Sequence, residues 1–300
     1  MSIQPSPGKR LKQLINGPKI LPLHAVYDGF SCRLIEKFGY QAGFLSGAAM
    51  SEANLGKPDV GLMGMEENLT ISRRLAASCG LTLLADCDTG YGNAVTVYHM
   101  TQQFEAAGVG GLMLEDQVWP KRCGHMKGKS VVSAEEYLEK LKAAVAARKD
   151  PDFVIKARTD SFTTHGLDEA IKRLNMYTEA GADFLLADAL ATEKDIETVV
   201  KNVSKPLCVN MGFAIRKRST TELISARRLE DLGVKAVMYG RMLSASAIQG
   251  MTNALNALAE TADLPKVKER EDLLVSFEEL NELMGLPAIN ALEQQFVTKR

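Results

Sequence analysis

The chain has 300 residues, of which 46% are hydrophobic and 24% charged, and its formal net charge is −1. These proportions are typical of a soluble globular protein, and the near-neutral charge gives no reason to expect nucleic acid or an anionic membrane as a partner. The apolar runs are shorter than the roughly 20 residues that span a bilayer, and the N-terminus lacks the apolar centre of a secretory signal. The five scattered cysteines form no CxxC pair, which argues against a disulfide framework and predicts a reducing, cytoplasmic location.

Short apolar runs recur along the chain and alternate with segments of helical periodicity. Continuous apolar runs suit strands of a parallel sheet that is covered on both faces. The expected strands are 20–28, 42–47, 81–90, 110–117, 153–160, 182–190, 206–212 and 235–240. The clearest expected helices are 133–148, 167–180 and 220–232.

Eight strand–helix units in succession close most naturally into a (β/α)₈ TIM barrel, because repeated right-handed crossovers curl the sheet round. A doubly wound open sheet is the alternative, although no GxGxxG follows the first strand. We expect a single domain over 1–300, with the barrel at about 18–260 and extra C-terminal helices at about 266–300. A helical tail beyond the barrel indicates packing on a neighbouring subunit, so we expect an oligomer.

Polar side chains end nearly every expected strand, which is where barrel active sites lie. We expect these side chains to converge on one mouth. They are Asp28, Ser46, Asp86, Asp88, Glu115, Asp116, Arg158, Asp160, Asp188 and Asn210.

Acidic groups dominate this set and predict a metal site. Asp86 and Asp88 are two apart on one strand and share a face, and Glu115 ends the next strand. Such an oxygen-rich pocket suits Mg²⁺, held directly or through waters, with helix capping or loop solvation as the alternative.

Two further strand ends suit a carboxylate substrate. Arg158 is a natural bidentate clamp for a carboxylate, or else a structural salt-bridge partner of the nearby acids. Ser46, Gly47 and Ala48 offer a hydroxyl and small residues that let backbone N–H groups approach an anion.

The connection after the fourth strand is long, running QVWPKRCGHMKGKSVV over 117–132. Long loops inside compact domains are usually functional. Cys123 lies there beside Lys121, Arg122 and His125, an electropositive setting that favours the thiolate and makes the thiol available for acid–base chemistry. An inert surface cysteine is the alternative.

Several motifs together resemble the isocitrate lyase / phosphoenolpyruvate mutase superfamily. They are ADCDTGYGN (85–93), LEDQVWPKRCGHMKGK (114–129), ARTD (157–160) and NALEQQF (290–296). PKRCGH is typical of the carbon–carbon bond-cleaving branch, and the chain is most similar to the group of 2,3-dimethylmalate lyase, oxaloacetate hydrolase and petal death protein.

The resemblance implies a role for each matching position. Asp86, Asp88 and Glu115 would hold Mg²⁺, or Mn²⁺, largely through waters, with Asp59 near the metal. Cys123 would act as the acid, Arg158 would bridge to the substrate, and His125 is a further catalytic candidate. The expected substrate contacts are Ser46, Gly47, Ala48, Gly124, Arg158, Asp188 and Asn210. The family also implies a homotetramer whose final helices are exchanged between barrels.

Three positions depart from the family pattern. Phe44 stands where a tyrosine is common, and Asp188 stands where the family has a glutamate. Phe213 replaces an acid and is followed by Arg216, Lys217 and Arg218. This change predicts a bulkier or more anionic substrate or a loop that is disordered in the free enzyme, with a solvated loop face as the alternative.

The sequence therefore predicts a Mg²⁺-dependent carbon–carbon lyase or hydrolase acting on a small 2-hydroxy or 2-oxo dicarboxylic acid. Two alternatives remain open. One is phosphorus–carbon chemistry of the carboxyphosphonoenolpyruvate mutase type, and the other is a non-catalytic barrel whose site has drifted.

Overall fold

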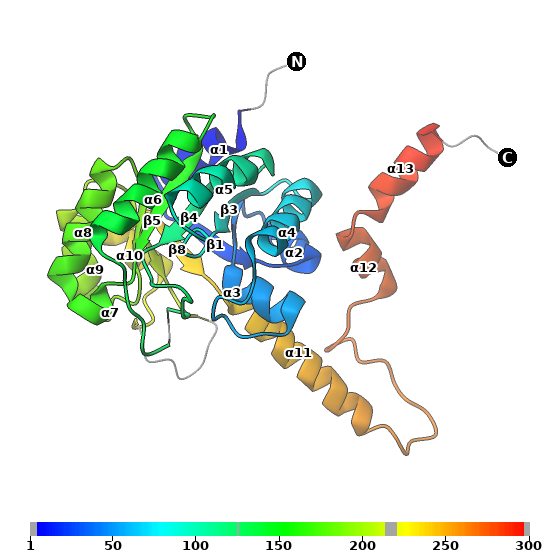
Figure 1. The fold of residues 1–300 in the computed structure, drawn as a ribbon. Coiled ribbons are helices and arrows are strands. Elements are labelled where there is room, and N and C mark those ends of the chain that lie inside the picture. Colours follow the sequence, from blue (N-terminus) through cyan, green and yellow to red (C-terminus); the bar gives the residue numbers. More distant parts are fainter. Residues whose placement is uncertain (1–4, 125, 214–220, 297–300) are drawn as a thin grey trace.

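Eight parallel strands close into a barrel in sequence order, β1 to β8 (Figure 1). The structure is a computed structural model that describes residues 5–124, 126–213 and 221–296. The strands are β1 Leu21–Val26, β2 Ala42–Leu45, β3 Thr82–Asp86, β4 Gly111–Glu115, β5 Val154–Thr159, β6 Phe184–Ala187, β7 Leu207–Asn210 and β8 Ala236–Tyr239. The barrel closes where β1 pairs with β8, with Leu21 opposite Ala236. The predicted (β/α)₈ barrel is confirmed, and the open-sheet alternative is excluded.

Helices surround the barrel and connect its strands (Figure 1). They are α1 Pro7–Ile15, α2 Gly29–Lys37, α3 Gly47–Met50, the π-helix η1 Ser51–Leu55, α4 Met65–Ser78, α5 Ala94–Ala106, α6 Ala134–Ala147, α7 Phe162–His165, α8 Leu167–Glu179, α9 Glu193–Asn202 and α10 Ala226–Asp231. The helices predicted over 133–148 and 167–180 are observed as α6 and α8. The helix predicted from 220 begins only at Ala226, because Ser225 caps it by accepting a hydrogen bond from the Arg228 N–H.

Two apolar layers hold these elements in place, one inside the barrel and one between the strands and the helices. Strand β5 contributes side chains to both apolar layers. Val154 belongs to the inner layer, whereas Ile155 and Ala157 belong to the outer layer, since successive side chains of a strand point to opposite faces. The same alternation turns Lys156 and Arg158 inward, with Arg158 at the C-terminal end.

The chain continues beyond the barrel into α11 Met242–Ala259, α12 Phe277–Leu283 and α13 Leu286–Phe296. Figure 1 shows α11 leading away from the barrel, with α12 and α13 beyond it. In α11 only Ser244 is buried, and α12 and α13 have no buried residue. The predicted extra C-terminal helices are therefore present, and they lie largely outside the folded core. Among the described residues, no helix combines the length and the apolar character needed to cross a membrane.

Candidate active site

A small cavity of about 50 Å³ lies at the C-terminal end of the barrel. We call it the barrel-end cavity. Its walls are Phe44, Ser46, Ala48, Asp59, Asp86, Lys121, Cys123, Gly124, Arg158, Asn210, Gly212, Met238, Gly240 and Arg241. Residues from six of the eight strand–helix units thus meet in a space that holds a few water molecules or a small anion.

The predicted metal-binding acids lie together beside this cavity. Asp86 ends β3 and Glu115 ends β4, and both are buried, as is Asp88. Asp88 has a φ of 47°, a left-handed conformation that is rare for a residue other than glycine and that occurs where a site constrains the backbone. Asp59 is also buried here, although it comes from the connection between β2 and α4.

Lys121 lies at the centre of these acids. Its ammonium contacts Asp59 and lies 2.8 Å from the Asp88 carboxylate. Burial lowers the pKa of Lys121, but the surrounding carboxylates outweigh it and hold that pKa well above its ordinary value. Burial raises the pKa of Asp88 to about 6 and that of Glu115 well above its usual range, although the nearby cations act in the opposite direction. The carboxylates around Lys121 therefore outweigh its single positive charge.

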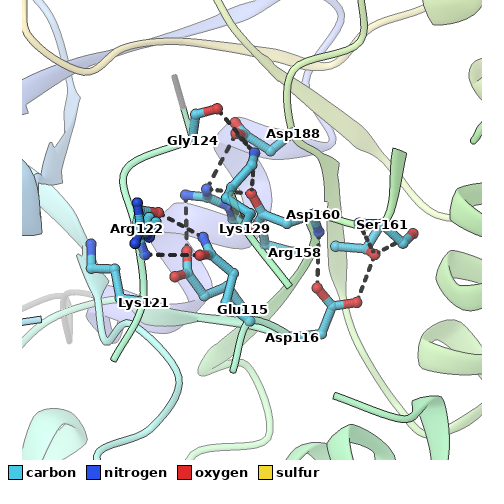
Figure 2. A network of polar contacts seen from close by, with 12 residues as sticks. Glu115, Asp116, Lys121, Arg122, Gly124, Lys129, Arg158, Asp160, Ser161 and Asp188 are labelled. Carbon is cyan, nitrogen blue, oxygen red and sulfur yellow. Dashed lines mark hydrogen bonds and ion pairs between the residues drawn. The ribbon is translucent and has the colours of Figure 1, made fainter. Parts of the chain in front are cut away.

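Arg158 is clamped by three carboxylates (Figure 2). Its Nη1 lies 3.0 Å from Glu115, its Nε 2.8 Å from Asp160 and its Nη2 3.2 Å from Asp188. Burial lowers the pKa of the guanidinium, but the carboxylates raise it further and leave it well above its ordinary value. Arg158 therefore forms salt bridges with the nearby acids, as the alternative interpretation of the sequence stated. It also lines the cavity, and this position suits substrate binding.

Cys123 and Gly124 reach the cavity from the β4–α6 loop, residues 116–133. Cys123 is buried, so it is not the surface thiol of the alternative interpretation. Its N–H donates to the Asp59 carbonyl at 3.2 Å. Gly124 fits closely, because a Cβ there would overlap the Asp188 carboxylate and lie 3.0 Å from Arg158 Nη2.

Gln117 and Lys129 anchor the two ends of this loop, and neither was predicted as a site residue. The Gln117 side-chain amide exchanges two hydrogen bonds of 2.9 Å with the backbone of Arg122. Lys129 donates to the Gly124 carbonyl at 2.9 Å and to Asp160 at 2.8 Å (Figure 2). The cluster of cationic residues in this loop is the one sequence signal that could have identified Lys129. From the sequence alone, these cations explain only why the Cys123 thiol should ionise easily.

Ser46 and Ala48, from the segment predicted to bind a carboxylate, also line the cavity. Ser46 caps α3 by accepting from the Ala49 N–H, and its hydroxyl donates to the Gly240 carbonyl at 3.1 Å. The Gly47 N–H donates to Asp86 at 3.3 Å, and Ala48 faces the cavity. Asn210, at the end of β7, lines the cavity from the other side.

Two strand-end residues predicted to face the mouth, Asp28 and Asp116, do not, and Phe213, a departure from the family pattern, lies outside the cavity as well. Asp28 caps α2, accepting from the Ser31 N–H at 2.7 Å. Asp116 accepts from Arg173 and Tyr177 of α8, so it faces the helix layer. Phe213 is 63% exposed and lines a separate cleft on the outside of the barrel. His125 and the predicted cationic positions 216–218 lie outside the described residues.

Arg241, directly after β8, also lines the cavity, and sequence reasoning missed it. Its Nη1–H donates to Cys123 Sγ at 3.1 Å. Gly240 and Arg241 follow the last strand, and the apolar run alone gave no reason to rank that arginine above other surface cations.

The fold and this cluster of buried acids, cations and a thiol define a barrel enzyme. A family model described as phosphoenolpyruvate phosphomutase matches residues 11–259, and the chain belongs to this family within the isocitrate lyase / phosphoenolpyruvate mutase superfamily. The superfamily assignment based on the sequence motifs is confirmed.

Individual relatives resemble the chain over nearly its whole length. The 2,3-dimethylmalate lyase of Eubacterium barkeri is 36% identical and the match covers 97% of this chain and 98% of that protein. A structure of oxaloacetate acetylhydrolase with the inhibitor 3,3-difluorooxalacetate has a TM-score of 0.89 at 29% identity, covering 98% of each chain. A complex of phosphonopyruvate hydrolase with oxalate and Mg²⁺ has a TM-score of 0.84 at 28% identity, covering 98% of this chain and 100% of that one.

Proposed function

We propose that the chain is a Mg²⁺-dependent lyase that cleaves a carbon–carbon bond in a small 2-hydroxy dicarboxylic acid, or a hydrolase of the corresponding 2-oxo acid. The observation that carries the proposal is the placement of the Cys123 thiol in the wall of a small polar cavity that Ser46, Ala48 and Arg158 also line. The relatives named as a dimethylmalate lyase and an oxaloacetate acetylhydrolase support the same class of reaction.

The donor set fits a hard divalent cation bound largely through waters. Asp59, Asp86, Asp88 and Glu115 supply only oxygen ligands, and Glu115 Oε1 is buried with no hydrogen-bond partner among the described residues. Within the same residues, no three acidic, histidine or cysteine side chains lie close enough to hold one ion directly. When bound, Mg²⁺ would stabilise negative charge on the substrate oxygens, and Mn²⁺ accepts the same ligands.

Substrate binding uses the walls already described. Ser46, Gly47 and Ala48 would hold one carboxylate, with Arg158 opposite. Gly124, Asp188 and Asn210 are also proposed substrate contacts. The 50 Å³ cavity of this closed arrangement favours a compact acid over a long one.

The reaction then consists of two proton transfers around one bond cleavage. A base takes the proton of the 2-hydroxyl group, a carbonyl forms, and the electrons of the carbon–carbon bond pass to the departing carboxylate enediolate. The Cys123 thiol gives its proton to the enediolate carbon, while the β4–α6 loop excludes water. Arg158 and Lys121 offset the negative charge that develops. His125 stays a candidate for a catalytic role.

We also propose that the C-terminal helices are exchanged between subunits of a homotetramer. An outer cleft of about 540 Å³ lies against the outside of β1 and β8, with His24, Tyr40 and Tyr239 in its wall. In a closed barrel the helix after the eighth strand ordinarily belongs to the outer ring. Here α11 leads away instead and exposes an apolar stripe, which the same cleft on another copy would cover.

The test is a turnover and thermal-shift screen with Mg²⁺, using the wild-type chain and Cys123→Ser. The panel contains 2,3-dimethylmalate, methylisocitrate, isocitrate, oxaloacetate, citramalate and phosphonopyruvate. We expect metal-dependent release of a 2-oxo acid or oxalate that falls by orders of magnitude in Cys123→Ser while substrate binding persists. An unimpaired Cys123→Ser variant would contradict the role of the thiol.

Two other outcomes of the same screen correspond to the alternative functions. Turnover of phosphonopyruvate alone would replace the proposal with phosphorus–carbon chemistry, which the phosphonopyruvate hydrolase relative exemplifies. Stabilisation by an acid without any turnover would replace it with a binding protein.

A further inference from the structure

Arg241 joins the end of β8 to the cysteine of a distant loop. Its guanidinium is largely buried, with 14% of the side chain exposed. The Nη1–H donates to Cys123 Sγ at 3.1 Å, and both residues line the barrel-end cavity. The contact links positions 118 residues apart in the chain.

The opposite edge of the same guanidinium is fixed by Glu52 of η1. Nε lies 2.9 and 3.2 Å from the two carboxylate oxygens, and Nη2 lies 2.9 Å from one of them. Such a two-point pairing restrains the plane of the guanidinium as well as its position. Nη1 is thereby aimed at the sulfur.

Three segments that follow different strands thus meet at the Arg241 side chain. Glu52 follows β2, Cys123 follows β4, and Arg241 follows β8. Asp59 strengthens the junction, because its carboxylate lies 3.7 Å from Arg241 Nη2 and its carbonyl accepts from the Cys123 N–H.

We infer that Arg241, oriented by Glu52, is a positioning residue that fixes the Cys123 thiol over the cavity and latches the β4–α6 loop closed. The inference rests on the proposed function, in which Cys123 transfers a proton to carbon. Proton transfer requires the sulfur within hydrogen-bond reach of the reacting carbon, so a thiol that is free to rotate away transfers less often.

The kinetic test compares Arg241→Gln, Arg241→Lys and Glu52→Gln on the acid that the panel identifies. We expect Arg241→Gln to lower kcat about 10- to 100-fold and to change KM less than about threefold, because positioning acts on the chemical step. Arg241→Lys should recover part of kcat, since an ammonium can still donate to sulfur. Glu52→Gln should have a smaller effect and add little to Arg241→Gln, because the two residues act as one unit.

A control separates these effects from loss of a salt bridge in general. Arg228 pairs with Glu193 on the surface, 52% exposed and outside the cavity. Arg228→Gln should leave kcat and KM unchanged. A rise in KM with unchanged kcat in Arg241→Gln would overturn the inference and make Arg241 a substrate-binding residue. Unchanged kcat and KM would overturn it as well.

Amide hydrogen exchange tests the latch without any substrate. We expect faster exchange over residues 117–132 in Arg241→Gln than in the wild-type chain or in Arg228→Gln, because the closed loop loses its contact with β8. Unaltered exchange there would refute the latch. If no acid is turned over by the wild-type chain, the proposed function fails, yet this exchange measurement still decides the role of Arg241.

Discussion

Lys156 is buried inside the barrel, and within the part of the chain that the structure describes no carboxylate forms an ion pair with it. Its ammonium nitrogen lies 2.8 Å from Met238 Sδ and within 4.9 and 5.8 Å of the ring centres of Phe184 and Phe44. Burial lowers the pKa of this amine. Aromatic faces and a thioether solvate a cation far less well than water, so its protonated form destabilises the fold.

We predict that Lys156→Met raises the free energy of unfolding at pH 7 by roughly 1–4 kcal/mol. The folded pKa lies below the ordinary 10.5, so the unfolded chain binds the proton more strongly. The penalty is complete below the folded pKa and fades as the pH rises toward 10.5. Urea unfolding at pH 7 and near pH 10 should therefore show a smaller gain at high pH. Lys201→Met, on the surface, is the matched control, and a gain that grows with pH would contradict the assignment.

Asp116 supports the active site from the outer layer. It accepts hydrogen bonds from Thr159, Arg173, Tyr177 and the Asp160 N–H, at 2.6 to 3.0 Å. The hydrogen bond from the Asp160 N–H fixes the backbone of Asp160, whose carboxylate pairs with Arg158. The residue is thus structural in this fold, although it stands next to Glu115 in the sequence.

We predict that Asp116→Asn costs roughly 3–5 kcal/mol of stability, because it removes the fully buried one of the two carboxylates that pair with Arg173. Thermal and urea denaturation measure the loss, with Asp231→Asn on exposed α10 as the control. A variant as stable as the wild-type chain would show that Glu169, the other partner of Arg173, suffices.

Residue type and strand position predicted much of the site, but not the direction of each side chain. Asp86, Asp88 and Glu115 lie close together, as expected, because they stand at or just beyond the ends of consecutive buried strands. Asp28 and Asp116 have the same sequence signature, and only the start of α2 and the packing of α8 turn them away. Arg241 was missed because its partners, Glu52 and Cys123, lie far off in the chain.

The β4–α6 loop is the element whose closure forms the cavity. Gln117 holds its beginning, Lys129 holds its end, and Arg241 contacts its tip. Gly124 lies between them, where the space next to Asp188 and Arg158 accommodates no side chain. The loop can therefore close over the acids only with glycine at this position.

We predict that Gly124→Ala lowers kcat at least about 100-fold, because the added methyl group displaces Cys123 or opens the cavity. The barrel itself should keep its melting temperature within a few degrees, since the loop contributes little to the two apolar layers. Steady-state kinetics and a thermal scan measure both. Gly29→Ala, at the start of α2, is the control because an added Cβ there meets no atom within 4 Å, and equal activity of both variants would contradict the close fit.

Helix α11 differs from the other helices in what it buries. Ile248, Met251, Leu255 and Leu258 are all at least 59% exposed, and their spacing places them on one face. An apolar stripe of this size on an unattached helix is typical of a contact surface.

We predict that Leu255→Glu together with Leu258→Glu converts the proposed homotetramer to smaller species without unfolding the barrel. Both side chains are at least 66% exposed in the single chain and lie outside the barrel core, so the barrel should stay folded. Sedimentation velocity measures the mass, and circular dichroism checks the fold. Val95→Glu, at an equally exposed apolar position on α5, should leave the mass unchanged. An unchanged mass in the double variant would argue against the exchange of α11.

At the scale of the molecule, the repeat of apolar runs was enough to predict the barrel. All eight expected strands are observed, because each run is buried on both faces and each helix covers its neighbours. The start of α10 was misplaced, since capping by Ser225 sets it locally. The course of α11 away from the barrel was not predictable from its own sequence, because an apolar helix face packs equally well on its own barrel or on another.

Arg241 is followed at once by Met242, the first residue of α11. The backbone that presents a guanidinium to the reactive sulfur is therefore continuous with the helix proposed to dock on a second copy. Under that arrangement, dilution below the dissociation constant of the assembly releases the helix and loosens the side chain that precedes it. The turnover number per chain would then fall as the enzyme itself becomes scarce, and the protein would act as a sensor of its own abundance.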